Sequence, residues 1–435
     1  MLLTLIFFVI LAPINGRDKT PLDNIAERYV KLALKVGLHN ADYIDAYFGP
    51  AEWKPAPIND SSKIFPSEGL NREAADLIDE MAKIQETNLS PSQQGHWRFL
   101  DGQIKSLAGM IDIINGKKMT FNEESLALYG IVAPSYDSLH YDSVLQRLNK
   151  LLPGEGSISE RMTEFRNQFL VPRCKIDTLI KIAIADCRAL TGKHIKLPDG
   201  ENFTVELVAN QPWGAYNWYK GDYASLIQID TSDEIRIPDI IGYAAHEGYP
   251  GHHVQNILQE SAFYRDSGWA EFCVQPLFSP TNLIMEGAAN FGIELLFPKK
   301  EWAAYMKKTI CPLAGIDTSE IDRYYDINKE RNNLSFAGVD GARRYIDGEW
   351  SKEKTIRWLM HYRLMTRKEA EDDFSFYEKY RAYIITYSVG ESLIRNYIET
   401  HGGTGDNPER GWELFTKLLA THVTVSDLID STSPK

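Results

Sequence analysis

The stretch PDIIGYAAHEGYPGHHVQNILQ, residues 238–259, decides how the chain is interpreted. It begins with a proline where a helix tolerates one, and apolar residues then lead to His246 and Glu247. In a zinc-binding helix, an HExxH sequence places two imidazoles one turn apart on one face, so that both can bind one metal at about 2.0 to 2.1 Å. Here the fourth residue after His246 is Pro250. A straight HExxH helix is therefore excluded.

The Pro250-Gly251 pair predicts an irregular backbone between the histidines. Proline removes a backbone donor and glycine tolerates conformations closed to other residues, so we expect the helix to break or bulge there. Omitting the pair leaves H-E-G-Y-H, which makes His252 the preferred second ligand. His253 would lie about 10 Å from His246 along an unbroken helix. We expect it to orient a ligand, contact the substrate or bind a second metal.

The segment NLIMEGAANFGIE, residues 282–294, supplies the predicted third ligand. A catalytic zinc site usually has three protein ligands and one position open to water. Glu286 is the best candidate, because the small residues that follow it allow close packing against the histidine helix. Glu294 is a candidate for orienting a histidine. Both glutamates could instead be solvated. We predict one zinc ion, with a second metal not excluded.

The rest of the chain has a mainly helical pattern. Apolar residues recur every three or four positions in five segments of the first half. These segments are 24–36, 72–85, 90–115, 141–152 and 176–190. Two short runs rich in Val, Ile and aromatic residues, 203–208 and 224–229, predict strands.

These patterns predict a mainly α fold with a small β-sheet. No repeat or flexible linker interrupts the chain. We therefore expect an N-terminal helical lobe at residues 17–200 and a metal-binding catalytic lobe at residues 201–435, within one globular unit.

The composition excludes one class of partner. The chain has 47 Lys+Arg against 60 Asp+Glu and a net charge of -13. Affinity for nucleic-acid phosphates needs clustered Lys and Arg, so we expect no nucleic-acid partner.

The N-terminus predicts export. The apolar run at residues 2–12 is too short to span a bilayer and is typical of a signal peptide, here residues 1–16. An uncleaved anchor or a buried helix is the alternative. We expect a secreted or periplasmic protein without a transmembrane span in the mature chain. Its four cysteines, at positions 174, 187, 273 and 311, permit up to two disulfides.

Two motifs resemble those of a known family. HEGYPGHHVQ at 246–255 and the later Glu286-Gly287 resemble the HExxPGHHxQ and EGWA signatures of the domain of unknown function 885 family, which is zincin-like. The resemblance runs from about residue 215 to 397 and includes Tyr387-Ser388-Val389-Gly390, similar to the family's SYxxG. It implies a zincin-like metallopeptidase architecture.

Three segments depart from the family pattern. Residues 381–384 read RAYI where the family has a PGQA-type segment, and residues 346–350 read IDGEW in place of a DTGxH-like stretch. The EGWA signature is EGAA here, at residues 286–289. The departures spare the three metal residues. No family substrate is transferred to this chain.

The metal chemistry assigns roles to the neighbouring residues. Zinc lowers the pKa of a bound water towards about 7, and a carboxylate beside it can take the proton during attack on a carbonyl. Glu247, next to a ligand, is the predicted general base. Tyr387 is the oxyanion donor that the resemblance implies, with His253 as the alternative. Arg343 or Arg344 could anchor a substrate carboxylate.

The segment WGAYNWYKGDY, residues 213–223, precedes the predicted edge strand 225–230 and contains five aromatic residues. In zincin-like enzymes an edge strand beside the metal helix can bind an extended substrate by strand addition, and aromatic side chains would wall the cleft. A purely structural aromatic cluster is the alternative.

These features together predict a zinc-dependent hydrolase that cleaves peptide bonds in a small peptide. One alternative is a hydrolase of another carbonyl substrate: a non-peptide amide, ester or thioester. Another is a secreted protein that binds zinc or a peptide without turnover. Glu247 favours catalysis, because a site that only binds needs no base beside His246.

Overall fold

The computed structural model describes residues 19–58, 65–420 and 422–430. The predicted signal peptide, residues 1–16, lies outside these ranges. Within them, no helix combines the length and the apolar character that crossing a membrane requires. The four cysteines are free thiols, and only Cys174 is exposed.

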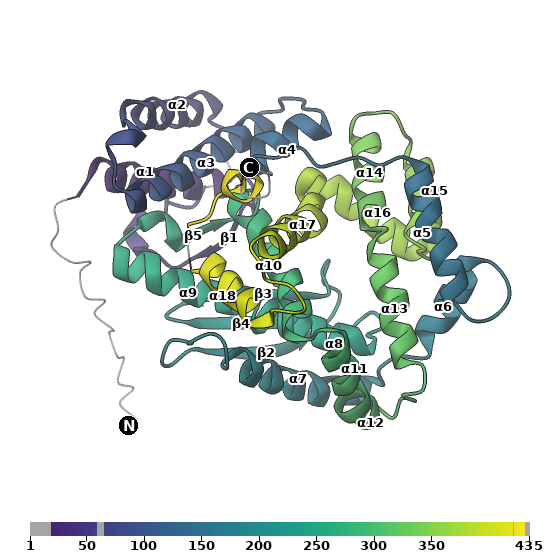
Figure 1. Cartoon of the computed structure of the whole chain (residues 1–435). Coiled ribbons are helices and arrows are strands. Elements are labelled where there is room, and N and C mark those ends of the chain that lie inside the picture. The colour runs from purple at the N-terminus through teal and green to yellow at the C-terminus, as the bar shows by residue number, and fades with distance from the viewer. Residues whose placement is uncertain (1–18, 59–64, 421, 431–435) are drawn as a thin grey trace, which may run out of the picture.

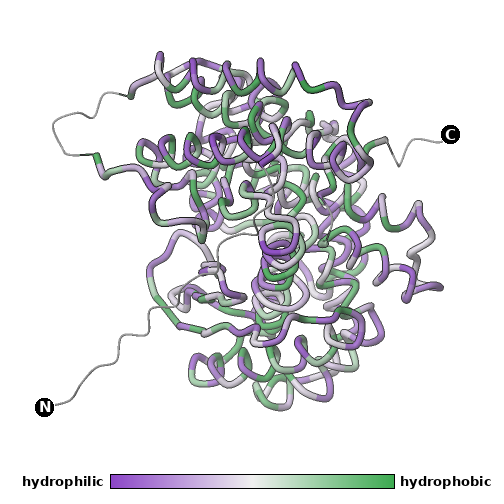
Figure 2. The backbone as a smooth tube through the Cα atoms, turned by 90° about the vertical axis from the view of Figure 1, so that its left-hand side faces the viewer, coloured by the Kyte–Doolittle hydropathy of each residue, from purple (hydrophilic) through white to green (hydrophobic). Residues whose placement is uncertain are grey.

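Apolar residues at helical spacing form the helices that the sequence predicts. In α1 (Pro21–Gly37), Ile25, Tyr29 and Leu32 face the core, and a capping box between Thr20 and Asp23 starts the helix. Figure 2 shows hydrophobic and hydrophilic residues alternating along such outer helices. The other predicted helices are α2 (Ser67–Lys83), α3 (Pro91–Ile114), α5 (Ser138–Leu151) and α7 (Ile176–Thr191).

Two helices in the first half of the chain were not predicted. They are α4 (Phe121–Tyr129) and α6 (Ile158–Asn167). Both begin with a capping box, Thr120 with Glu123 and Ser157 with Glu160. The spacing of a Ser or Thr three residues before a Glu was the signal that could have located them.

A three-stranded sheet contains both predicted strands and one more. Strands β2 (Asn202–Val208) and β4 (Ala224–Asp230) pair in parallel, and β3 (Ala215–Gly221) pairs antiparallel with β4. The strand order is β2-β4-β3. The prediction of β4 as an edge strand is therefore wrong. The aromatic segment before it folds back as β3 and pairs with it on one side, so β2 and β3 are the edge strands.

A second, two-stranded pair joins distant parts of the chain. Strand β1 (Ile44–Tyr47) pairs antiparallel with β5 (Val274–Pro276). The 3-10 turn Ala270–Cys273, which directly precedes β5, packs on α1. This pairing brings the N-terminal region beside the segment that contains the histidines.

The histidine segment is broken, as Pro250-Gly251 predicts. Helix α8 (Ile237–Tyr243) passes into a π-helical turn, Ala244–Gly248, and α9 (His252–Gln259) restarts after residues 249–251. A Cβ on Gly251 would overlap the carbonyl oxygen of His246 and lie 2.5 Å from that of Ala245. Only glycine fits where the chain passes this close to its own helix.

Helices α10 (Pro280–Leu296) and α17 (Ile385–Thr400) cross at the centre of the molecule (Figure 1). A Cβ on Gly287 of α10 would lie 2.7 Å from Cα of Gly390 in α17. The two backbones are therefore in contact, and this crossing places residues near the start of α17 beside Glu286.

The remaining described helices pack around this centre. One hydrophobic core extends from Leu22 to Leu428 and includes residues of both predicted lobes. The fold is mainly α with a small β-sheet, as predicted, whereas the lobe boundary at residue 200 stays a prediction. The helices are α11 (Lys299–Tyr305), α12 (Cys311–Ala314), α13 (Ile321–Asn332), α14 (Ser335–Ile346), α15 (Lys352–Tyr362), α16 (Arg367–Tyr380), α18 (Pro408–Leu419) and α19 (Val425–Asp430).

Candidate metal centre

The structure brings His246, His252 and Glu286 together. Their Nε2, Nε2 and Oε2 atoms form a triangle: 3.1 Å between the two imidazole nitrogens, 3.2 Å from Glu286 to His246 and 3.7 Å from Glu286 to His252. Ligand atoms around a tetrahedral zinc with bonds of about 2.0 to 2.1 Å are separated by about 3.3 Å. The three atoms therefore have the spacing of one face of such a site.

The chemistry of these groups fits a divalent cation. Glu286 Oε2 is buried and makes no hydrogen bond among the described residues, whereas Oε1 accepts one from the Tyr383 hydroxyl at 2.8 Å. Burial opposes the charge, yet His252 and His246 hold the pKa of Glu286 well below its usual range. In return, Glu286 outweighs burial and raises the pKa of His252 to about 9. Two imidazoles and one carboxylate are a donor set typical of catalytic zinc.

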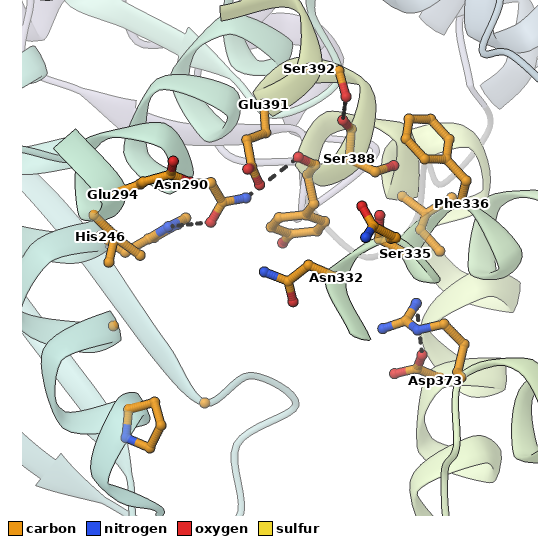
Figure 3. A pocket seen from close by; sticks show the side chains of 18 of the residues that line it. His246, Asn290, Glu294, Asn332, Ser335, Phe336, Asp373, Ser388, Glu391 and Ser392 are labelled. Carbon is orange, nitrogen blue, oxygen red and sulfur yellow. Dashed lines mark hydrogen bonds and ion pairs between the residues drawn. The ribbon is translucent and has the colours of Figure 1, made fainter. Parts of the chain in front are cut away.

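Asn290 orients His246. It lies one turn after Glu286 on α10, and its Oδ1 is 3.1 Å from His246 Nδ1. An amide oxygen only accepts, so Nδ1 carries the proton and Nε2 keeps its lone pair for a metal. Asn290 Nδ2 also donates to the backbone carbonyl of Tyr387, at 3.5 Å (Figure 3). The sequence analysis missed Asn290, although a position four residues after a predicted ligand shares its helix face.

We expect Asn290→Ala to weaken zinc binding by roughly 10- to 100-fold, as is usual when the partner of a histidine ligand is lost. A competition titration against a chromophoric zinc chelator measures the change. Asn396→Ala, which removes an exposed amide from α17, is the control and should bind like the wild type. Equal affinities for all three proteins would exclude this role for Asn290.

Glu294 does not take the orienting role considered for it. Its carboxylate binds Arg395, with distances of 3.1 and 2.8 Å, and this pair outweighs burial and lowers the pKa of Glu294. It lies about 12 Å beyond Glu286 along the helix. Asn290 is at the right distance for His246, and Glu294 is too far along.

Glu247 and Tyr387 both line the cavities beside the cluster. Glu247 is buried, and burial raises its pKa although His246 and His252 act in the opposite direction. The ring of Tyr387 lies edge-on to that of Tyr383, with centroids 5.7 Å apart. The Tyr387 side chain is exposed at its edge, but desolvation of its hydroxyl and the charge of Glu286 raise the pKa of Tyr387, so the hydroxyl remains a donor.

His253 points away from the cluster. Its Nδ1 is 2.8 Å from Ser225 Oγ on β4, and its Nε2 is 3.0 Å from a carboxylate oxygen of Glu201. The side chain is fully buried and lines none of the cavities described below. Neighbouring helix residues diverge by about 100°, so α9 cannot aim both histidines at one ion. The placement contradicts a direct role for His253 as an oxyanion donor or substrate contact.

Glu201 was not found from the sequence. Besides His253, it accepts hydrogen bonds from Tyr249 at 2.5 Å and from Arg188 at 2.7 Å. Burial opposes its charge, but these three partners lower the pKa of Glu201 to about 2. The buried group fixes α9 to the sheet.

The two arginines considered as substrate anchors lie elsewhere. Arg343 binds Asp340 and donates to the backbone carbonyl of Ala133, while Arg344 lies over the ring of Trp350. Neither arginine lines the large cleft beside the metal cluster. Its basic lining residues are instead Arg147, Lys329, Arg363 and Arg395.

Two cavities meet at the cluster. A cleft of about 1270 Å³ separates His246, Glu247 and Asn290 from residues of α13, α14 and α16 on the opposite wall (Figure 3). A smaller inner pocket of about 190 Å³ lies beside His252 and Glu286. His246, Glu247 and Tyr387 line both cavities.

Comparisons with known proteins bear on the fold. No protein-family model matches the chain, and no curated protein matches it. A solved structure of a putative lipoprotein from Colwellia psychrerythraea is similar, with a TM-score of 0.54 and 14% identity over 88% of this chain and 70% of that one. A putative lipoprotein of unknown function from Shewanella oneidensis has a TM-score of 0.45 and 12% identity, covering 82% and 73% of the two chains. The likeness to the Colwellia protein supports the fold.

Proposed function

We propose that this protein is a zinc-dependent hydrolase that cleaves peptide bonds. The observation that carries the proposal is the triangle of His246, His252 and Glu286, with Glu247 beside it where a large cleft meets an inner pocket. A base at such a junction is placed to act on a bond whose two sides occupy the two cavities.

The residues of the site have separate roles in this reaction. His246 Nε2, His252 Nε2 and Glu286 Oε2 would hold the ion. A bound zinc polarises a carbonyl and makes a water easier to deprotonate. Glu247 accepts the proton of the attacking water and returns it to the leaving amine. Tyr383 is committed to Glu286 by its hydrogen bond, so Tyr387, which lines both cavities, is the hydroxyl that donates to the developing oxyanion in this proposal.

The size of the cleft favours a peptide. About 1270 Å³ is more than a compact ester or thioester needs. Its walls present amides, hydroxyls and charged groups, among them Asn332, Ser335 and Asp373 (Figure 3). Such groups suit the backbone of an extended chain. The same residues could hydrolyse a non-peptide amide or an ester, which is the second candidate function.

A mixed peptide library, followed by mass spectrometry, tests the proposal. We expect cleavage that stops when a chelator is added and returns with zinc, and none with His246→Ala. Esterase activity without peptide cleavage would favour the second candidate. Bound zinc without turnover of either substrate class would leave the protein as a zinc-binding or peptide-binding protein.

We also propose that the protein acts outside the cytoplasm. The apolar run at residues 2–12 supports this location, and the description of the Colwellia protein as a putative lipoprotein agrees with it. Sequencing the N-terminus of the mature protein tests the proposal, with removal of residues 1–16 as the expected result.

A further inference from the structure

The inner pocket has two aromatic walls and an acidic residue. One wall comes from β3 and the turn before it, and the other comes from α16, α17 and the turn between them. Between them the pocket reaches Asp45 on β1. The aromatic residues are Trp213, Tyr216 and Trp218 on the first wall, and Phe376, Tyr380, Tyr383 and Tyr387 on the second.

Asp45 forms a hydrogen bond but no ion pair among the described residues. Its carboxylate accepts a hydrogen bond from the Tyr216 hydroxyl, and no Lys, Arg or His among the described residues forms an ion pair with it. The other aspartate of the pocket, Asp42, binds Lys379 at 3.0 Å. A carboxylate withdrawn from water costs free energy unless a cation or several donors compensate it. The lining thus holds the Asp45 carboxylate together with His252, which favours its charged form, and Lys379, which is paired with Asp42.

We propose that this pocket binds an ammonium group of the substrate. Asp45 supplies the counter-charge, and the aromatic side chains of the two walls supply cation–π attraction, as the rings of Trp218 and Tyr380 already do for Lys220 and Lys379. The identity of the ligand as a substrate rests on the proposed hydrolase function. Two sources share this chemistry: a free N-terminal amine and a lysine side chain.

The volume of the inner pocket limits which residue of the substrate can carry the ammonium group. The pocket, at about 190 Å³, has less than a sixth of the volume of the cleft, so we expect it to hold one residue of the substrate. The pocket also contains His252, Glu247 and Glu286. The positive charge therefore belongs to the residue that contributes the scissile carbonyl, and the remainder of the peptide occupies the large cleft.

Asp45→Asn tests the inference on four peptides with one cleaved bond. They carry Lys or norleucine before that bond, each with a free or an acetylated N-terminus. We expect the variant to lower kcat/KM by roughly 10- to 100-fold for the peptides that bear the recognised ammonium group and to leave the others unchanged. Sensitivity to acetylation identifies the N-terminal amine, and sensitivity to norleucine identifies the lysine side chain. An equal loss on all four peptides would overturn the proposal.

A binding measurement separates this inference from the hydrolase proposal. Calorimetry with 1-aminopentane and 1-pentanol needs no turnover, and the wild type should bind the amine at least tenfold more tightly. Asp45→Asn should remove that preference, whereas Asp266→Asn, which changes an exposed carboxylate, should keep it. Equal affinities for the two probes would overturn the proposal. So would loss of zinc from Asp45→Asn without any change in amine binding, since Asp45 would then position His252.

Discussion

Replacing Glu247 by Gln is expected to lower kcat by roughly 10²- to 10⁴-fold while zinc remains bound. The amide has the shape of the carboxylate but cannot accept the proton of the attacking water. Zinc should remain, because Glu247 is not one of the three residues of the triangle. Initial rates on a peptide identified from the library, together with the zinc content by mass spectrometry, measure both effects.

The control for this variant is Glu301→Gln, which makes the same change at an exposed position of α11. It should retain the rate of the wild type. A Glu247→Gln enzyme that works within a few-fold of the wild type would show that another group accepts the proton.

The second large effect is expected for Gly251→Ala. The new Cβ meets two carbonyl oxygens, those of His246 and Ala245, and both belong to the backbone, so neither can rotate away. We expect the free energy of unfolding to fall by about 3 kcal/mol. The break must open to admit the methyl group, which moves His252 away from His246 and weakens zinc binding as well. Urea unfolding in zinc-free buffer and a zinc titration report the two losses separately.

Gly102→Ala is the matched control. Gly102 lies inside α3, and a Cβ there would meet nothing within 4 Å. Alanine has the higher helix propensity, so this variant should gain about 0.5 to 1 kcal/mol. A Gly251→Ala protein as stable as the wild type, with unchanged zinc affinity, would contradict the close approach seen at the break.

Local patterns predicted most of the secondary structure, and distant contacts account for strands β1 and β3, which were missed. The predicted helices of the first half and strands β2 and β4 follow from periodicity alone, whereas α4 and α6 needed their capping boxes as a signal. Strand β1 was missed because it is stabilised by β5, about 230 residues later. Strand β3 was missed because its aromatic residues also suit a cleft wall. Both errors concern pairing, which a local pattern does not contain.

The same distinction holds for the candidate site. The close spacing of His246, His252 and the Pro250-Gly251 pair was sufficient to predict the break and the preferred ligand. A substrate contact or an oxyanion role was among the expectations for His253, but its partners, Ser225 and Glu201, come from the sheet region. The inner pocket could not be predicted, since its lining residues extend from Asp42 to Tyr387 and meet only in the folded chain.

The contact between α10 and α17 has a consequence for motion. Because Gly287 and Gly390 meet at the crossing, no side chain separates the two backbones there. We therefore expect the two helices to move as one rigid body. Breathing of the large cleft then has to come from its opposite wall, formed by residues of α13, α14 and α16. We expect hydrogen exchange to be slow in the crossing helices and faster in that wall, with a peptide substrate slowing the wall alone.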